Sequence, residues 1–257
     1  MAVRASLKSA RRPAPARRAA AAPPRRIAAV DALRGLAIVA MVAYHFSFDL
    51  RLFRLARFDF ENDPFWLGAR AAIVASFMAL VGVSLVLART QGVAPARRWR
   101  RVAQIAACAA AVSVASRLVF PATWIWFGIL HAIAVTSVIA WPLARHPLPA
   151  FALGIAVIVA GLAVAHPAFD APALAWIGFT TAKPATQDYV PLFPWLGAAL
   201  VGIAAGDALV RRDFAPLRLL ASAPRALAWL GRHSLAVYMV HQPILIGALA
   251  LALRRLP

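Results

Sequence analysis

The chain has 257 residues, of which 63% are hydrophobic, and a formal net charge of +19. A soluble domain with a polar shell does not reach a mean hydropathy of +0.74, so the composition predicts a polytopic membrane protein in a lipid bilayer. The Arg residues lie mainly between apolar segments, where they orient membrane helices, so we expect no nucleic-acid partner despite the charge.

The first 26 residues are almost entirely Ala, Arg and Pro, with eight Lys or Arg and no acidic residue. This composition cannot bury a core, so we expect a disordered, basic cytoplasmic tail over residues 1–26 and a single transmembrane domain over residues 27–257. A twin-arginine signal or an organelle transit peptide is the alternative. The apolar run that follows is too long and too charged for a cleaved signal, and we expect it to stay as a signal anchor.

The first apolar segment, residues 26–53, is long enough to cross a bilayer but carries ionisable side chains. Such groups are costly inside a spanning helix unless they serve a partner or a pathway. At 100° per residue they fall within a sector about 60° wide, so we expect this face to look into the protein interior or a wet cavity. The four residues are Asp31, Arg34, His45 and Asp49.

Seven segments have the length and hydropathy of spanning helices, which predicts an all-α, polytopic membrane helix bundle. With the N-terminus in the cytoplasm, 19 Arg or Lys lie on the inner side and 8 on the outer side, which favours this orientation. An odd number of spans puts the termini on opposite sides. The segments are approximately Ile27 to Leu50, Phe65 to Ala88, Val102 to Val119, Trp124 to Trp141, Leu148 to Ala165, Pro191 to Val210 and Ser234 to Leu253.

Three connections carry further signals. The outer loop from Arg51 to Pro64 is rich in Phe and indicates an interfacial turn, and the connection from His166 to Val190 indicates a short interfacial or re-entrant piece. The inner stretch from Phe214 to Arg232 alternates Leu with Arg, so we expect an amphipathic helix on the cytoplasmic surface. No internal repeat is visible in the sequence, which weakens an inverted-repeat transporter.

Two histidines are expected at matched depth. Counted along their segments, His45 and His131 both lie about 10 Å below the outer boundary, and Asp49 is one turn from His45. A hydrogen-bonded packing role is the alternative for each histidine alone, but together the three residues predict a catalytic site. Arg70, near the outer end of the second segment, is expected either to serve that site or to snorkel to the headgroups.

The last segment combines polar residues with a proline. Ser234, Tyr238 and His241 share one face, and Pro243 frees a backbone carbonyl. A kinked, polar helix usually lines a cavity. Counted from the inner edge, His241 lies about 10 Å deep, a different level from the other two histidines, so we expect it to line the cavity rather than to catalyse.

The stretch DYVPLFPW precedes the sixth segment and places Asp188 and Tyr189 at the outer mouth, with Trp195 at its end. We take these three as candidate contacts for a substrate, with a helix cap as the alternative for Asp188. Further along, Gly202 and Gly206 are spaced for a close helix contact.

The sequence lacks the motifs of metal-dependent, nucleotide-binding and serine-nucleophile enzymes. The sequence contains no metal-ligand spacing, phosphate-binding Gly loop or nucleophile elbow. Cys108 is the only cysteine, which excludes an intrachain disulfide and a Cys-based metal site. We therefore expect no metal, and chemistry at this chain would depend on histidine.

Four blocks, in the right order, resemble the catalytic domain of the heparan-α-glucosaminide N-acetyltransferase family in its small bacterial branch. The first block also looks like the membrane-bound acyltransferase-3 families, in which an Arg followed by ten residues and a His recurs, here Arg34 and His45. Together the blocks extend over nearly the whole chain after residue 26. They are LRGLAIVAMVAYHF, FGILHAIAV at 127–135, DYVPLFPWLG at 188–197 and GRHSLAVYMVHQP at 231–243.

The resemblance implies transmembrane acyl transfer from a cytoplasmic acyl-CoA, expected to be acetyl-CoA, to a saccharide or glycolipid amine or hydroxyl on the far side. His45 would act as the general base or hold the acyl group transiently, and Asp49 would fix its tautomer. Arg34 would meet the phosphates or pantetheine of CoA. Arg70, Tyr238 and His241 are taken as further acyl-CoA contacts, and Asp188, Tyr189 and Trp195 as acceptor contacts.

The chain departs from the family pattern at one point. Eukaryotic members use a His in the outer loop after the first helix and an Asn at the position of His45, whereas the loop from Arg51 to Pro64 contains no His. Either His45 replaces that residue or the bacterial branch uses different chemistry. The arginines of residues 97–101 are a further candidate for binding CoA phosphates, although we favour their role in orienting the chain in the membrane.

We therefore expect a multi-pass acyltransferase of the bacterial inner membrane, with a homo-oligomer left open. A proton-coupled transporter or flippase is the first alternative, with the ionisable face relaying protons. A non-catalytic membrane subunit, in which that face joins helices, is the second.

Overall fold

The computed structural model describes residues 26–254, with the side chain of residue 221 left aside. The predicted tail, apart from Arg26, lies outside the described residues. Within them the fold is helical, and β-type pairing is limited to one isolated bridge between Phe127 and Tyr189. The all-α prediction is confirmed for this part of the chain.

Within residues 26–254, five helices are long and apolar enough to cross a membrane: α1 (Ala28–Leu52), α2 (Pro64–Thr90), α3 (Pro95–Val119), α6 (Leu192–Arg211) and α9 (Ser234–Leu253). Two apolar helices are shorter, α4 (Ile129–Ile139) and α5 (Pro147–Ala163). The connections contain the 3-10 turns η1 (Pro142–Arg145), η2 (Pro167–Asp170), η3 (Ala175–Ile177) and η4 (Ala215–Leu217), and the short helices α7 (Arg218–Ala221) and α8 (Arg225–Arg232).

The predicted count of seven full spans is therefore not supported, because the fourth and fifth segments form shorter helices. At 1.5 Å per residue, α4 is about 16 Å long, roughly half of a bilayer core, and α5 is about 25 Å long. The first part of the fourth segment is extended because it pairs with the chain before α6. The N–H of Gln187 donates to the carbonyl of Thr123 (2.9 Å), and the N–H of Val190 donates to that of Phe127 (3.3 Å).

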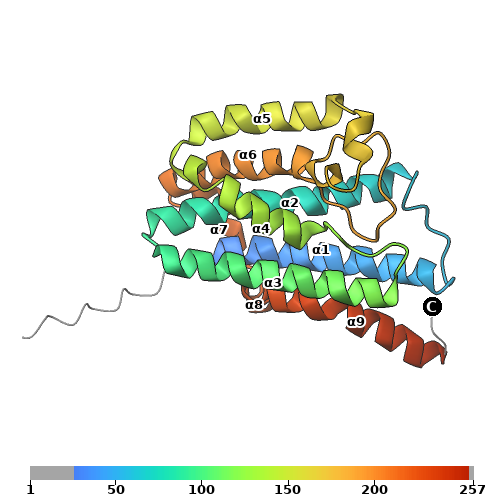
Figure 1. The fold of residues 1–257 in the computed structure, drawn as a ribbon. Coiled ribbons are helices and arrows are strands. Elements are labelled where there is room, and N and C mark those ends of the chain that lie inside the picture. The colour runs from blue at the N-terminus through green and yellow to red at the C-terminus, as the bar shows by residue number, and fades with distance from the viewer. Residues whose placement is uncertain (1–25, 255–257) are drawn as a thin grey trace, which may run out of the picture.

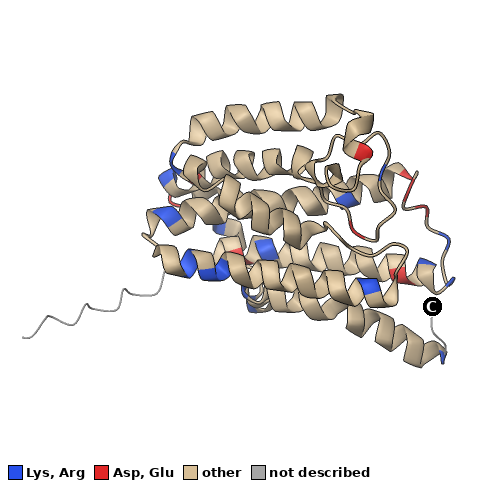
Figure 2. Ribbon diagram, viewed as in Figure 1, with Lys and Arg blue, Asp and Glu red and all other residues tan. Residues whose placement is uncertain are grey.

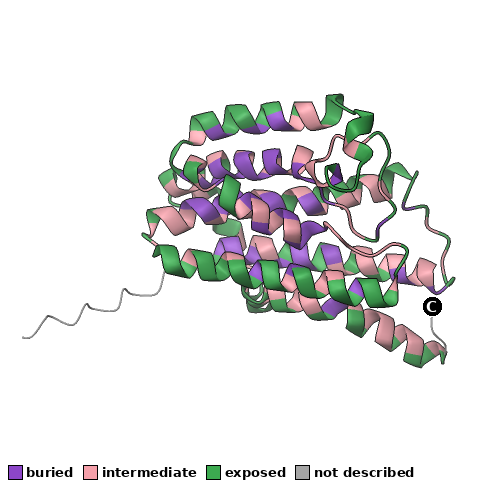
Figure 3. Cartoon of the chain, viewed as in Figure 1, coloured by how far each residue is buried: buried purple, intermediate pink, exposed green. Residues whose placement is uncertain are grey.

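The long helices lie side by side in layers (Figure 1), with α5 at one edge, α9 at the other, and α6, α2 and α1 between them. Buried residues concentrate on α1, α2 and α6, whereas α3 and α9 turn mostly exposed faces outward (Figure 3). The predicted close contact at Gly202 and Gly206 is confirmed, since added Cβ atoms there would meet the backbone of Ala79 and Val83 on α2.

Basic residues gather where α2 leads into α3, and most acidic residues lie at the opposite end of the bundle (Figure 2). We call these the basic end and the mixed end. The basic end contains Arg97, Arg98, Arg100 and Arg101, and the mixed end contains the loop with Asp59, Glu61 and Asp63.

Helix α8 packs against the first turns of α1 through two glycines. A Cβ at Gly231 would overlap the carbonyl oxygen of Asp31, and one at Gly35 would overlap that of Leu227. The expected single amphipathic helix over residues 214–232 is interrupted at Ser222 and Pro224, and its last part lies against the backbone of α1. The start of α9, directly after α8, is thereby held beside α1.

We expect Gly231→Ala to destabilise the protein by about 1–3 kcal/mol, because either α8 or α1 must move to admit the methyl group. Thermal unfolding of the purified protein, followed by tryptophan fluorescence, measures this effect. The matched control is Gly68→Ala in α2, where an added Cβ meets nothing within 4 Å and alanine should stabilise the helix by a few tenths of a kcal/mol or more. Equal melting temperatures for the two variants would contradict the tight α1–α8 contact.

Candidate active site

Two histidines from different helices meet near the mixed end. The ring centroids of His45, on α1, and His241, on α9, lie 4.9 Å apart at an interplanar angle of 60°. The ring of Tyr238 lies 5.5 Å from that of His241, and the ring of Tyr44 lies 6.0 Å from that of His45. The predicted inward-facing side of α1 thus faces α9 at this level.

A carboxylate and an amide lie next to this pair. Asp49 is fully buried, and the side-chain amide of Gln242 donates a hydrogen bond of 2.6 Å to its Oδ1. Three buried polar atoms here have no hydrogen-bond partner within the described residues: Asp49 Oδ2, His241 Nε2 and Gln242 Oε1. Because unsatisfied buried polar atoms are costly, they indicate a place where a substrate or water completes the bonding.

The protonation of His241 follows from its hydrogen bond. Its Nδ1 lies 2.7 Å from the carbonyl oxygen of Tyr238, and a carbonyl can only accept. Nδ1 therefore carries the hydrogen, and Nε2 of the neutral ring keeps a lone pair. Since Nε2 is one of the unpartnered atoms, His241 offers a proton acceptor beside His45.

The predicted depth of His241 was wrong. It assumed that α9 begins at the membrane surface. In the structure, the contact of Gly231 with Asp31 and Gly35 starts α9 beside the second turn of α1. Rising about 1.5 Å per residue from there, both helices bring their histidines to one level.

His131 is held elsewhere. The N–H of Gly128 donates to its Nδ1 (3.2 Å), its Nε2 lies 3.2 Å from Ser113 Oγ, and its ring stacks on Phe127 at 5.6 Å. With both nitrogens engaged at the start of α4, this arrangement favours the packing alternative. A catalytic role for His131 stays a prediction.

The three predicted acceptor contacts lie around the start of α4 and α6. Asp188 Oδ2 accepts a hydrogen bond of 2.9 Å from the backbone N–H of Ile129, so the helix-cap alternative applies to α4. The hydroxyl of Tyr189 donates to the carbonyl of Ala175 (2.7 Å), and Trp195 packs on the cluster around Met78. Gly128 lacks the Cβ that would overlap the Asp188 carboxylate.

Two cations stand near Asp188. Burial raises the pKa of Asp188 above its ordinary value, and the N–H of Ile129 and the charges of Lys183 and Arg70 partly oppose this shift. Burial also lowers the pKa of Lys183, as does the nearby charge of Arg70, and the carboxylates of Glu61 and Asp188 partly oppose this shift. Within the described residues, Arg70 has no carboxylate at ion-pair distance. Arg70 and Lys183 thus place two cations around Asp188 at the mixed end.

A cavity of about 530 Å³ opens at the basic end and runs between α1, α2, α3, α4 and α9. Its deep end is lined by Ile129, Ile133 and Tyr238, so it reaches the residue that packs beside His241. The middle is apolar, with Phe77 and Leu80. Its mouth is lined by seven arginines: Arg26, Arg34, Arg97, Arg98, Arg100, Arg101 and Arg232.

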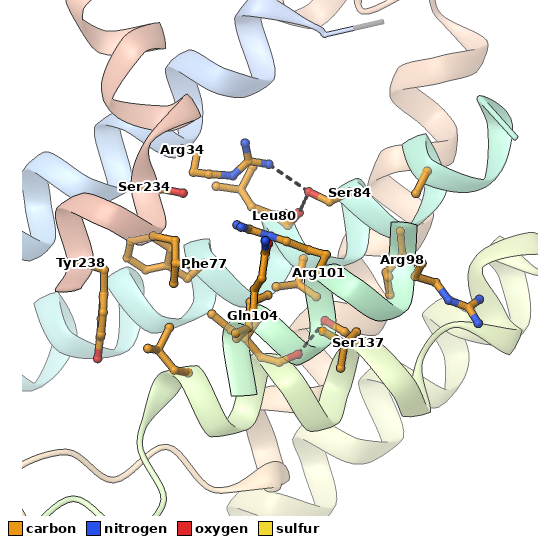
Figure 4. A pocket seen from close by; sticks show the side chains of 18 of the residues that line it. Arg34, Phe77, Leu80, Ser84, Arg98, Arg101, Gln104, Ser137, Ser234 and Tyr238 are labelled. Carbon is orange, nitrogen blue, oxygen red and sulfur yellow. Dashed lines mark hydrogen bonds between the residues drawn. The ribbon is translucent and has the colours of Figure 1, made fainter. Parts of the chain in front are cut away.

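Arg34 and Arg101 extend into this cavity from opposite walls (Figure 4). Arg34 is anchored by Asp31 (3.0 Å) and by Ser84 Oγ (2.9 Å). Arg101 has no ion pair among the residues described, and Arg98 stacks on Trp141 at 4.0 Å. The cavity therefore joins a strongly cationic mouth to an apolar neck.

Sequence reasoning missed Gln242, Lys183 and the specific position of Arg101. Gln242 could have been found from its place beside His241 in a proline-containing helix. Arg101 was hidden among arginines that the orientation rule explains equally well.

A family model described as heparan-alpha-glucosaminide N-acetyltransferase, catalytic, matches residues 26–243. Neither the search of curated proteins nor the search of solved structures found a matching relative. Because the family match extends over most of the chain, from α1 through both histidines of the pair, this protein belongs to the heparan-alpha-glucosaminide N-acetyltransferase catalytic family of membrane proteins.

Proposed function

We propose that this protein transfers an acetyl group from cytoplasmic acetyl-CoA to an amine or hydroxyl of an extracytoplasmic saccharide or glycolipid. In this proposal the basic end and the N-terminus face the cytoplasm of a bacterium, and the mixed end faces outward across the inner membrane. The family name supports an amino sugar as the acceptor.

The observation that carries the proposal is the cavity that leads from the arginine mouth to Tyr238. A CoA molecule has phosphates at one end and an extended, weakly polar arm that ends in the thioester. Arginines suit the phosphates, and the neck at Phe77 and Leu80 suits the arm. From Arg34 to His45 the rise along α1 is about 16 Å, which an extended arm can reach.

The chemistry follows from the two imidazoles. The acceptor nitrogen attacks the thioester carbonyl carbon, the new C–N bond forms, and the C–S bond breaks. His45 accepts the proton that the amine loses and passes it to the departing CoA thiolate, which leaves as the thiol. His241, with its Nε2 lone pair, lies beside His45 as a second acceptor for this proton, and Asp49 is held nearby through Gln242, the residue after His241.

The test uses the full-length protein purified in detergent. Acetyl-CoA at 100 times its Kd should raise the free energy of unfolding by about 2.7 kcal/mol, and CoA thiol should be released only when an amino sugar is added. CoA lacking the 3′-phosphate is the matched control and should stabilise less, because it meets fewer arginines. Proton uptake without thiol release would favour a transporter. If neither acetyl-CoA nor the amino sugar had an effect, a non-catalytic subunit would be favoured.

A further inference from the structure

A second hollow lies between α1 and α2, on the membrane side of the histidine pair. It has a volume of about 380 Å³, within the range of roughly 300–1,000 Å³ typical of ligand sites. Four alanines and three aromatic residues line it, together with Ser47 and Ile73. We call it the α1–α2 groove, and its main walls are Ala40, Ala43, Ala69, Ala72, Tyr44 and Trp66.

The groove exists because the two helices pack closely at one end only. Toward the basic end, Val30 and Ala37 of α1 are buried against Leu80 and Val83 of α2. Toward the mixed end, small side chains face one another, and Ala40, Ala43 and Ala72 remain exposed. An apolar furrow of this kind in a membrane helix pair opens to the hydrocarbon of the bilayer.

Two residues connect the groove to the candidate active site. Tyr44 forms part of its wall, and its ring also lies edge-on against His45 at 6.0 Å. Arg70 follows the wall residue Ala69, and its charge acts on Tyr44, Lys183 and Asp188. An anion at the end of the groove formed by Tyr44 and Ala69 would therefore lie near the charge of Arg70, which also acts on Lys183.

We propose that the acceptor is a lipid-linked amino sugar whose hydrocarbon chain lies in the α1–α2 groove and whose phosphate binds Arg70 and Lys183. This inference rests on the proposed acetyl transfer and names its substrate class. The phosphodiester places the sugar amine at His45, where the acetyl group moves to nitrogen as described above. The chain and the phosphate remain unchanged, so the step needs no further reactant.

The combination of apolar groove and cations decides between acceptor classes. A soluble anionic saccharide would bind the cations but would leave the apolar groove unfilled. A bulk phospholipid would fill the groove, but it has no amino sugar to place at His45, next to the wall residue Tyr44. A chain joined through a phosphate to an amino sugar uses all three features.

The experiment compares two esters of glucosamine 1-phosphate, one with a decyl and one with a methyl group, so that both carry the same charge. Each buried methylene should improve binding about fourfold, so kcat/KM for the decyl ester should exceed that for the methyl ester by at least about 100-fold. Filling the groove with Ala69→Leu should lower this ratio at least tenfold. The matched control, Ala71→Leu, lies exposed on the same helix outside the groove and should keep the ratio.

Binding of the decyl ester, measured by native mass spectrometry, separates this inference from the catalytic proposal. An adduct seen with the unaltered protein and with Ala71→Leu, but lost in Ala69→Leu, supports the groove even if no acetyl group is transferred. Equal kcat/KM for the two esters would assign a soluble saccharide and overturn the inference. Displacement of the adduct by equimolar phosphatidylglycerol would show an ordinary lipid contact and overturn it as well.

Discussion

Replacing His45 by alanine is expected to reduce acetyl transfer by about 10³-fold, because the acceptor amine loses the group that takes its proton. The substitution removes no hydrogen bond among the described residues and leaves a half-buried site, so folding should persist. Release of CoA thiol, measured at saturating acetyl-CoA, reports the loss. His241→Gln should lower the rate by a similar order, because it removes the lone pair at Nε2.

Two other histidine variants serve as controls for His45→Ala. His146→Ala changes an exposed histidine before α5 and should leave the rate unaltered. His131→Ala should lower the melting temperature, because it frees Ser113 and the N–H of Gly128, while the protein that remains folded still releases thiol. Full activity of His45→Ala, or loss confined to His131→Ala, would move the chemistry to the start of α4.

Replacing Arg101 by glutamine is expected to raise the KM for acetyl-CoA about tenfold or more and to leave kcat within a factor of two. A hydrogen bond from a charged group to phosphate contributes about 1.5–3 kcal/mol, and Arg101 has no ion pair among the described residues that its loss would expose. Arg34 is a poorer choice, because its removal would leave the buried Asp31 unpaired. Initial rates over a range of acetyl-CoA concentrations measure both constants.

The control for Arg101→Gln is Arg145→Gln, which removes the same charge from an exposed position in η1 that does not line the cavity. Its KM should stay within a factor of two of the original. If both variants raised KM equally, general surface charge would explain the effect. An unchanged KM for Arg101→Gln would rule out the arginine mouth as the phosphate site.

The helical spacing of residues in α1 allowed most of the candidate-site residues on this helix to be predicted from the sequence. Helical spacing is a local property, so the sequence alone placed Asp31, Arg34, His45 and Asp49 on an inward face, and burial of both carboxylates confirms that face. The pairing of His45 with His241 is not local. It depends on where α9 begins, and that position is set by backbone contacts of α8 with α1 that hydropathy does not reveal.

The error in the fourth segment has a similar origin. Residues 124–128 are as apolar as a spanning helix, but their backbone forms hydrogen bonds with other segments. The carbonyls of Trp124 and Phe127 accept hydrogen bonds from the chain before α6, and Ile125 bonds to serines of α3. Asp188 caps α4 from 59 residues away. Matched depth then singled out His131, which shares no contact with His45 among the residues described. Backbone pairing between distant segments determines whether such an apolar segment forms a helix, and the composition of the segment does not reveal that pairing.

The contact between Gly35 and Gly231 makes the reaction centre sensitive to changes far from it. About ten residues, or 15 Å along α1, separate Gly35 from His45. A methyl group at either glycine would push α8 away from α1 and tilt α9, which follows α8 directly. The tilt would increase the distance between the rings of His45 and His241. Such variants should turn over slowly even when every residue that touches a reactant is intact.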